Sequence, residues 1–166
     1  MARSRAVRVV LAAALLGSIG YGWWVGGRAT AGTTYPGTVV STVDGDTIVV
    51  QFADGRQETV RLLGVDTPET HHPTKPVECF GPEASAYTQA RLLGRRVTLE
   101  RDAEARDLYG RFLAYVTVDG ARFNDELLRL GYARLLVIPP NGAHGRMMLA
   151  AELDAQHARR GMWGAC

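Results

Sequence analysis

Cysteine is scarce in this sequence, and it contains no internal repeat or low-complexity block. Only two of the 166 residues are cysteine.

His71 and His72 have no further soft ligands nearby that would complete a zinc site, so the segment 70–78 is expected to be an exposed loop. The 46% hydrophobic and 22% charged residues suit one globular domain with a sizeable core.

A net positive charge is also missing from most of the chain. Four of the 19 basic residues precede Gly32, which leaves 15 against 17 acidic residues and a net charge of −2 from there onward. A protein that attracts polyanions through its overall field has the opposite balance. If this chain binds nucleic acid, individual arginines must make the contacts.

Long hydrophobic runs are limited to one, near the N-terminus. Arginines stand within residues 1–8, and no charge follows from Val9 to Gly27. This pattern predicts an export signal, and Ala29-Thr30-Ala31 supplies an Ala-x-Ala cleavage pattern. We expect residues 1–31 to be a signal peptide, or an uncleaved anchor because the run nearly spans a bilayer. Residues 32–166 would then form a domain that is secreted or held on the outer face of the cytoplasmic membrane.

The two cysteines are expected to pair. Cys79 stands where the loop enters the first expected helix, and Cys166 is the last residue. In an exported chain, two cysteines are more often paired than left as free thiols. We therefore predict a Cys79–Cys166 disulfide, with two unrelated thiols as the alternative.

Runs rich in β-forming residues alternate with turn sequences in the first half of the domain. Asp44-Gly45-Asp46 and Ala53-Asp54-Gly55-Arg56 are turn sequences, because Gly and Asp tolerate the positive φ angles of tight hairpins. They separate three runs that form a meander, and further runs follow. The expected strands are 38–43, 47–52, 57–63, 97–100 and 111–118, with a last strand-like run at 133–138.

Helical patterns follow the third, the fifth and the last of these runs. Pro82 in the first turn predicts a helix from residue 81 to about residue 93. Asn124 is expected to cap a short helix that ends before Gly131, and helical spacing occurs again from residue 146 to about residue 160. The sequence therefore predicts an α+β fold, a five-stranded Greek-key barrel of OB type with about three helices.

The stretch 61–69, Arg-Leu-Leu-Gly-Val-Asp-Thr-Pro-Glu, carries charged residues where an apolar run ends. Arg61 lies on the expected strand, and Asp66 and Glu69 follow at its exit. A fixed cation beside two acids suits an anionic substrate together with a metal ion or a general base. A strand that leaves the core through a polar turn has the same composition without any such role. Asp46, at the start of the second strand, would meet Asp66 if the sheet curls.

Two further motifs give this stretch a family context. Asp44-Gly45-Asp46-Thr47 precedes it, and Asp107-Leu108-Tyr109-Gly110-Arg111 follows it. In this order and at these spacings the three motifs resemble the signature segments of the staphylococcal nuclease (thermonuclease) family, and the resemblance extends from about residue 35 to residue 163. It implies an OB-fold barrel with helices and a calcium-dependent phosphodiesterase that cuts DNA and RNA. We expect a monomer that prefers single-stranded substrates.

The resemblance also implies a role for individual residues, position by position. The matching residues are Asp46, Asp66 and the backbone carbonyl of Thr67 for calcium, Glu69 for the general base, Arg61 and Arg111 for the phosphate, and Lys75 and Tyr109 for the flanks of the nucleotide.

One part of the family pattern is missing. The two tyrosines with which the family contacts the nucleotide have no counterpart, because Leu136-Val137-Ile138-Pro139 occupies that segment. Each stacked base contributes about 1–3 kcal/mol of binding free energy, so we expect weaker and less base-selective binding.

The chemistry of the residues agrees with the resemblance. Attack of water on a phosphodiester builds negative charge, which forked arginine donors and a divalent cation stabilise. Carboxylate and carbonyl oxygens are hard ligands, which favours calcium over zinc. The alternative function is an OB-fold module that binds single-stranded nucleic acid or a protein partner without cutting it.

Overall fold

The computed structural model describes residues 33–70 and 76–166, so the expected leader and Lys75 lie outside the described residues. No helix in these two ranges is long and apolar enough to cross a membrane. In chain order the elements are β1 Thr34–Thr42, β2 Thr47–Gln51, β3 Gln57–Leu62, β4 Gly64–Asp66, α1 Gly81–Leu92, β5 Arg96–Glu100, β6 Phe112–Val118, β7 Ala121–Arg122, α2 Phe123–Leu130, β8 Arg134–Leu136, α3 Gly145–His157 and α4 Met162–Ala165.

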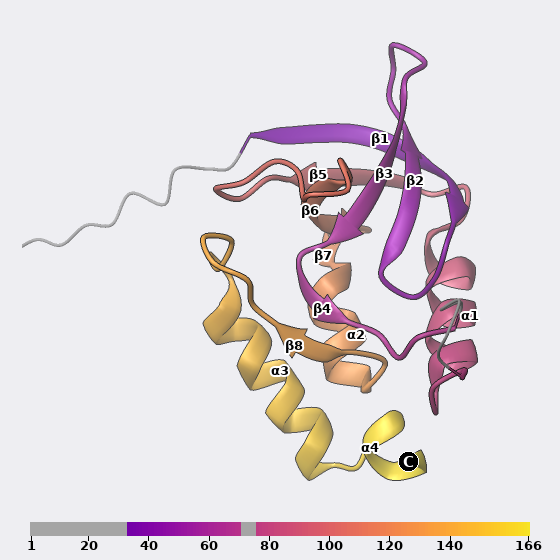
Figure 1. The fold of residues 1–166 in the computed structure, drawn as a ribbon, viewed down its shortest axis with the longest axis vertical. Coiled ribbons are helices and arrows are strands. Elements are labelled where there is room, and N and C mark those ends of the chain that lie inside the picture. The colour runs from indigo at the N-terminus through magenta and orange to yellow at the C-terminus, as the bar shows by residue number, and fades with distance from the viewer. Residues whose placement is uncertain (1–32, 71–75) are drawn as a thin grey trace, which may run out of the picture.

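A closed β-barrel forms one end of the molecule (Figure 1). The main sheet has the order β3-β2-β1-β5-β6-β7, and a parallel pairing of β3 with β6 closes its first five strands. Strand β1 belongs to both sides of the barrel, because residues 34–38 pair with β5 and residues 38–42 with β2. A register shift between Val39 and Ser41 bends β1 at this change of partner. The predicted OB-type barrel is confirmed.

The barrel interior is filled by aliphatic side chains from every barrel strand. Val39, Val50 and Val60 have no exposed surface. Strand β6 is buried at every residue except Thr117, which is partly exposed. It is covered this thoroughly because β3 and β5 flank it and α2 packs against it.

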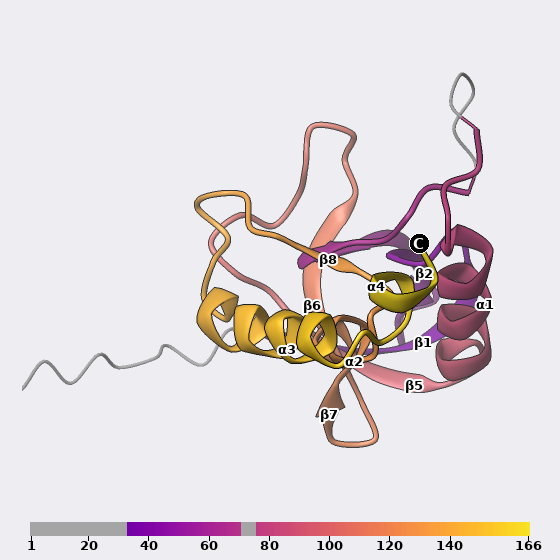
Figure 2. The same ribbon diagram turned by 90° about the horizontal axis from the view of Figure 1, so that it is seen from below.

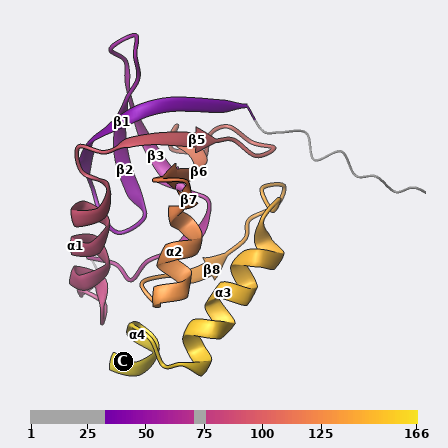
Figure 3. The same ribbon diagram turned by 180° about the vertical axis from the view of Figure 1, so that it is seen from behind.

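Helix α2 lies between α1 and α3 beneath the barrel (Figures 1, 2 and 3). It begins at Phe123 with Arg122 as the capping residue, so the prediction that Asn124 caps this helix is wrong. Asn124 is fully buried instead. Its Oδ1 accepts a hydrogen bond from the Val116 N–H at 2.8 Å, and its Nδ2 donates to the Leu63 carbonyl at 2.8 Å. One amide thus joins α2 to β6 and to the end of β3.

The C-terminal segment differs in detail from the prediction. Helix α3 is followed by the four-residue helix α4, which lies beyond the predicted helix and was not expected. Met162 is the buried residue of α4, and Trp163 is partly exposed. The predicted Cys79–Cys166 disulfide is present and joins the start of α1 to the C-terminus.

Strand β4 continues the chain beyond β3 but belongs to a second sheet. Gly64 has a φ of 75°, a backbone conformation that turns the chain away from β3 and that favours glycine. Strand β4 then pairs with β8, so that Asp66 lies opposite Arg134. This small sheet holds the segment that delivers Asp66 and Thr67 to one end of the barrel.

Candidate active site

The loop that precedes β2 approaches the end of β4 closely. The Thr67 N–H donates to Asp46 Oδ2 at 2.9 Å, and the Thr67 hydroxyl donates to the same oxygen at 3.2 Å. A Cβ at Gly45 would lie 2.7 Å from Thr67 Oγ1, which explains the glycine. Gly45 is not among the positive-φ residues of the described chain, so its role is close approach and not the turn conformation that the sequence predicted. The contact joins Asp46 to the Asp66-Thr67 pair, as the resemblance implies.

Arg61 lies between the β2 loop and the end of β4. Its Nη1 donates to the carbonyls of Leu62 and Val65 at 3.1 and 2.8 Å. The same Nη1 lies 3.0 Å from Asp46 Oδ1, and Nη2 lies 3.2 Å from Asp66 Oδ1. The guanidinium therefore links the two predicted metal-binding carboxylates.

Asp46 is a buried carboxylate in an acidic neighbourhood. Burial raises its pKa to about 6, against the lowering effect of the Arg61 guanidinium. The charges of Asp44 and Asp66 raise the pKa further, whereas the hydrogen bond from Thr67 lowers it. Burial outweighs the attraction of Arg61, and an additional cation beside the two aspartates would favour the ionised form of Asp46.

Arg111 directly precedes β6 and is held by its own loop. Asp107 Oδ2 accepts a hydrogen bond from Arg111 Nε at 2.6 Å, and Asp107 Oδ1 accepts from the Arg111 N–H at 2.9 Å. The guanidinium carbon lies 5.5 Å from the centre of the Tyr109 ring. Neither Nη atom of Arg111 makes a hydrogen bond to any described residue, so both are available to an anion.

The backbone of Glu69 is hydrogen-bonded to Glu78. Its N–H donates to a Glu78 carboxylate oxygen at 3.2 Å, and the Glu78 N–H donates to the Glu69 carbonyl at 2.9 Å. The Thr70 N–H donates to Glu69 Oε1 at 2.9 Å. Glu78 directly precedes Cys79, so the disulfide lies one residue from the backbone that positions Glu69.

One pocket of about 210 Å³ brings the predicted residues together. Asp46, Asp66, Thr67, Glu69 and both arginines line it, although they come from three separate segments of the chain. Tyr109 lies beside it and is 85% exposed. The described residues that line it are Asp44, Asp46, Arg61, Asp66, Thr67, Pro68, Glu69 and Arg111.

The donor atoms of this pocket fit a hard cation with few protein ligands. Carboxylates predominate, and none of the described residues that line the pocket carries a soft donor. In the described ranges no three His, Cys, Asp or Glu side chains converge on one point as a complete metal cage. A cation here would take backbone oxygen and water for its remaining ligands, which is common for calcium.

Sequence reasoning missed several residues that position the site. Asp44 Oδ1 accepts the Asp46 N–H at 3.0 Å. The Thr88 hydroxyl on α1 donates to the Gly45 carbonyl at 2.7 Å. The pairing of Asp107 with Arg111 was open to prediction only as a contact between neighbours in one short loop, since both belong to the same five-residue motif. The contact of Thr88 spans 43 residues, and no local signal predicts it.

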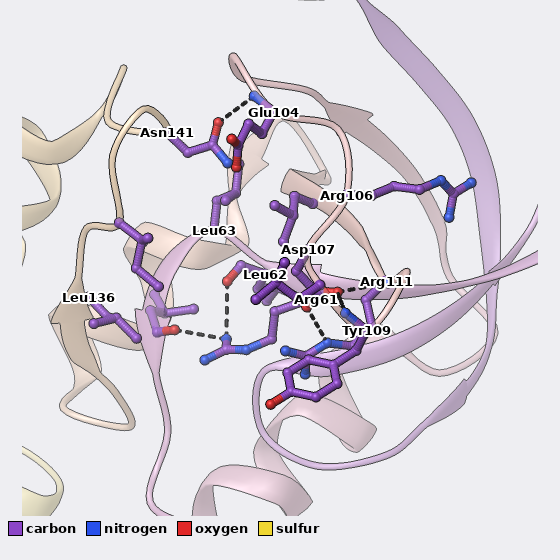
Figure 4. A pocket seen from close by; sticks show the side chains of 15 residues that line it. Arg61, Leu62, Leu63, Glu104, Arg106, Asp107, Tyr109, Arg111, Leu136 and Asn141 are labelled. Carbon is purple, nitrogen blue, oxygen red and sulfur yellow. Dashed lines mark hydrogen bonds and ion pairs between the residues drawn. The ribbon is translucent and has the colours of Figure 1, made fainter.

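A second pocket, of about 500 Å³, lies beside the first (Figure 4). Arg61 and Arg111 line both pockets, so the two spaces meet at the arginines. Its walls are largely aliphatic and include Leu136 and Ile138 from the segment that lacks the family's tyrosines. Glu104 and Asn141 lie at the end away from the arginines (Figure 4).

The sequence is similar to those of known proteins. The family model described as "Staphylococcal nuclease homologue" matches residues 59–165. The chain belongs to the staphylococcal nuclease family. The match includes Arg61, Asp66, Glu69 and Arg111 but not Asp46, which the structure brings to the same pocket.

Individual members of the family are similar over most of their length. The thermonuclease of Staphylococcus hyicus is 41% identical over 125 residues, which cover 75% of this chain and 73% of the relative. The thermonuclease of Staphylococcus intermedius is 44% identical over 121 residues, 73% of this chain and 71% of the relative. Endonuclease YncB of Bacillus subtilis is 38% identical over 128 residues, 76% of this chain and 60% of the relative.

Proposed function

We propose that this protein is a calcium-dependent nuclease that hydrolyses phosphodiester bonds of DNA and RNA. Its family, together with relatives named thermonuclease and endonuclease, makes it a nuclease and therefore a hydrolase. The observation that carries the proposal is the convergence of Arg61, Arg111 and Glu69 with two aspartates on one small pocket.

The two arginines are proposed to hold the phosphate. Hydrolysis adds negative charge to the phosphoryl oxygens as water attacks, and preorganised donors lower the free energy of that transition state. The free Nη atoms of Arg111 suit this role, because its Nε is already fixed by Asp107 at 2.6 Å. Glu69, at the pocket wall, is proposed to accept a proton from the attacking water or to orient it.

Asp46, Asp66 and the Thr67 carbonyl are proposed to hold the calcium ion. When bound, the ion would stabilise negative charge on the phosphate and orient the substrate. Sites with few protein ligands bind calcium weakly, with dissociation constants of roughly 10⁻⁴ to 10⁻³ M. Lys75 and Tyr109 are proposed to flank the nucleotide.

The test is cleavage of denatured DNA and of RNA by the purified full-length protein. We expect cleavage at millimolar calcium, loss of cleavage with a chelator and less turnover with magnesium, which demands stricter octahedral geometry. Glu69→Gln, which keeps the shape of the side chain, serves as the inactive control. Full activity in chelator would contradict calcium dependence, and nucleic-acid binding without any cleavage would favour the non-catalytic module.

Single-strand preference, the monomeric state and export are further parts of the proposal. Cleavage rates on native and denatured DNA would test the first, and light scattering of the purified protein the second. The intact mass of protein recovered outside expressing cells tests whether residues 1–31 are removed on export. A mass equal to that of a chain starting at Gly32 indicates a cleaved signal peptide, and full-length protein in the membrane fraction indicates an anchor.

A further inference from the structure

The larger pocket has different chemistry at its two ends. Arg61 and Arg111 stand where it meets the carboxylate pocket, and Glu104 and Asn141 stand at the far end (Figure 4). Aliphatic walls separate the two ends. A nucleotide has the same division, because its phosphate is anionic, its base has flat apolar faces, and the edge of the base carries hydrogen-bonding groups.

Asn141 has a fixed orientation at the far end. It is 5% exposed, and its Oδ1 accepts a hydrogen bond from the Glu104 N–H at 2.7 Å. This bond determines which amide atom is oxygen and leaves Nδ2 as a donor for another group. Nδ2 makes no hydrogen bond to a described residue. The buried side-chain atoms without a partner in the described chain are Arg101 Nε and Trp163 Nε1, so Nδ2 is not shut off from the pocket space.

The carboxylate of Glu104 has no hydrogen-bond or ion-pair partner in residues 33–70 and 76–166. The neighbouring acids of this region differ, since Asp107 is paired with Arg111 and Glu58 with Arg106. The far end of the pocket therefore offers a carboxylate acceptor beside an amide donor.

We propose that Glu104 and Asn141 select guanine in the nucleotide whose phosphate the two arginines hold. The edge of guanine has two adjacent donors, N1–H and N2–H, beside the O6 acceptor. A carboxylate accepts both donors while an amide NH₂ donates to O6. Adenine and cytosine each offer one amino donor next to an acceptor, and thymine and uracil offer a single N–H between two carbonyls.

This selection does not require aromatic stacking, and it runs against the expectation of less base-selective binding that followed from the two missing tyrosines. Leu136 and Ile138 give the base aliphatic contact only, so discrimination falls to the polar end of the pocket. A site built to bond a polar group rejects a ligand that lacks it, because its own groups then remain unpaired. The inference rests on the proposed function, since it takes the arginines as the phosphate site.

The experiment is calorimetric binding of three nucleoside 3′,5′-bisphosphates, those of deoxyguanosine, deoxyinosine and thymidine, to the full-length protein with calcium. Deoxyinosine lacks only the N2 amino group. We expect deoxyguanosine to bind on the order of tenfold more tightly than deoxyinosine, the size of one hydrogen bond to a charged group. Thymidine should bind more weakly than both.

Glu104→Gln keeps the backbone N–H that holds Asn141 but loses the charge that accepts two donors. In this variant we expect deoxyguanosine to bind no more tightly than deoxyinosine, whereas Glu83→Gln, on the exposed start of α1, should behave as the wild type. Equal binding of the three ligands by the wild type, or unchanged selectivity in Glu104→Gln, would overturn the inference and leave the proposed nuclease intact. Absence of both binding and cleavage would overturn the two together.

Discussion

Arg61 and Arg111 are held by the protein in different ways. The Arg61 guanidinium contacts two carbonyls and two carboxylates, and its side chain is 14% exposed. Arg111 is held at Nε by Asp107 alone. Removal of Arg61 would leave Asp46 buried without its counter-charge. Removal of Arg111 would leave Asp107, which is more exposed and keeps its hydrogen bonds from two backbone N–H groups. Arg111 is thus the better residue for separating catalysis from stability.

Arg111→Ala is expected to lower kcat by about 10²-fold or more, because it removes a donor that acts on the transition state. The free energy of unfolding should change little. Arg95→Ala is the control, since Arg95 is also a solvent-accessible arginine in an ion pair, 2.6 Å from Asp119, and lines neither pocket. Steady-state kinetics and urea unfolding of both variants check the prediction, which a near-normal rate for Arg111→Ala would refute.

Asn124→Ala is expected to destabilise the fold without touching the site. The Val116 N–H and the Leu63 carbonyl would lose their partner inside the core, and each unsatisfied buried group costs about 1–3 kcal/mol. Urea unfolding measures the change, with Gln89→Ala on the exposed face of α1 as the control. Equal stability of the two variants would show that water replaces the amide.

At the scale of elements, the loop 101–110 is tied to the barrel by one acid on β3. Glu58 accepts hydrogen bonds from both Arg106 Nη atoms at 2.9 and 2.8 Å, and also from Arg56 at 2.7 Å. Arg106 Nη1 in turn donates to the Gly110 carbonyl at 2.7 Å. These contacts of Arg106 with Glu58 and Gly110, called the clamp below, hold the loop that carries Asp107 and leads to Arg111.

Arg106→Gln is expected to speed amide hydrogen exchange in the loop 101–110 at neutral pH. The hydrogen bond from Arg106 is the main reason why the pKa of Glu58 lies below its usual range. The clamp is therefore fully present above the ordinary glutamate pKa and is lost as pH falls through the lowered one. Protection in the wild type should fall in that acid range, whereas Arg95→Gln should leave the loop unchanged. An identical exchange pattern in Arg106→Gln would contradict the clamp.

At the scale of the whole molecule, the disulfide joins segments 87 residues apart. It connects α4 and the C-terminus to the start of α1, below the barrel (Figure 1). Gly131, after α2, meets α4 from the other side, because its carbonyl accepts the Met162 N–H at 2.9 Å. The last residues are therefore part of the folded domain.

Reduction of the Cys79–Cys166 bond is expected to lower stability by up to about 4–5 kcal/mol, the entropic estimate for closing a loop of this length. Denaturant unfolding of oxidised protein, reduced protein and a Cys79→Ser/Cys166→Ser variant measures the loss. Reduced protein and the double variant should agree with each other. Two alkylated thiols in unreduced protein, detected by intact mass, would rule the bond out.

Much of the secondary structure was open to prediction from local sequence. Runs rich in β-forming residues between turn sequences predicted the barrel strands, and Pro82 predicted the start of α1. The boundaries were less accurate, since β1 starts four residues before its prediction and β8 is shorter than 133–138. Strand ends depend on which neighbour pairs with them, and a single strand does not carry that information.

The sequence by itself determined the order of the three motifs, the family and the two cysteines available for pairing, because these depend only on residue type and spacing. Tertiary structure alone decided that Asp46 meets Thr67, that Asn124 bridges β6 and β3, and that Glu104 faces a pocket. These contacts arise when the barrel closes and α2 packs beneath it. Their partners lie far apart in the chain, and only the closed barrel brings them within hydrogen-bonding distance.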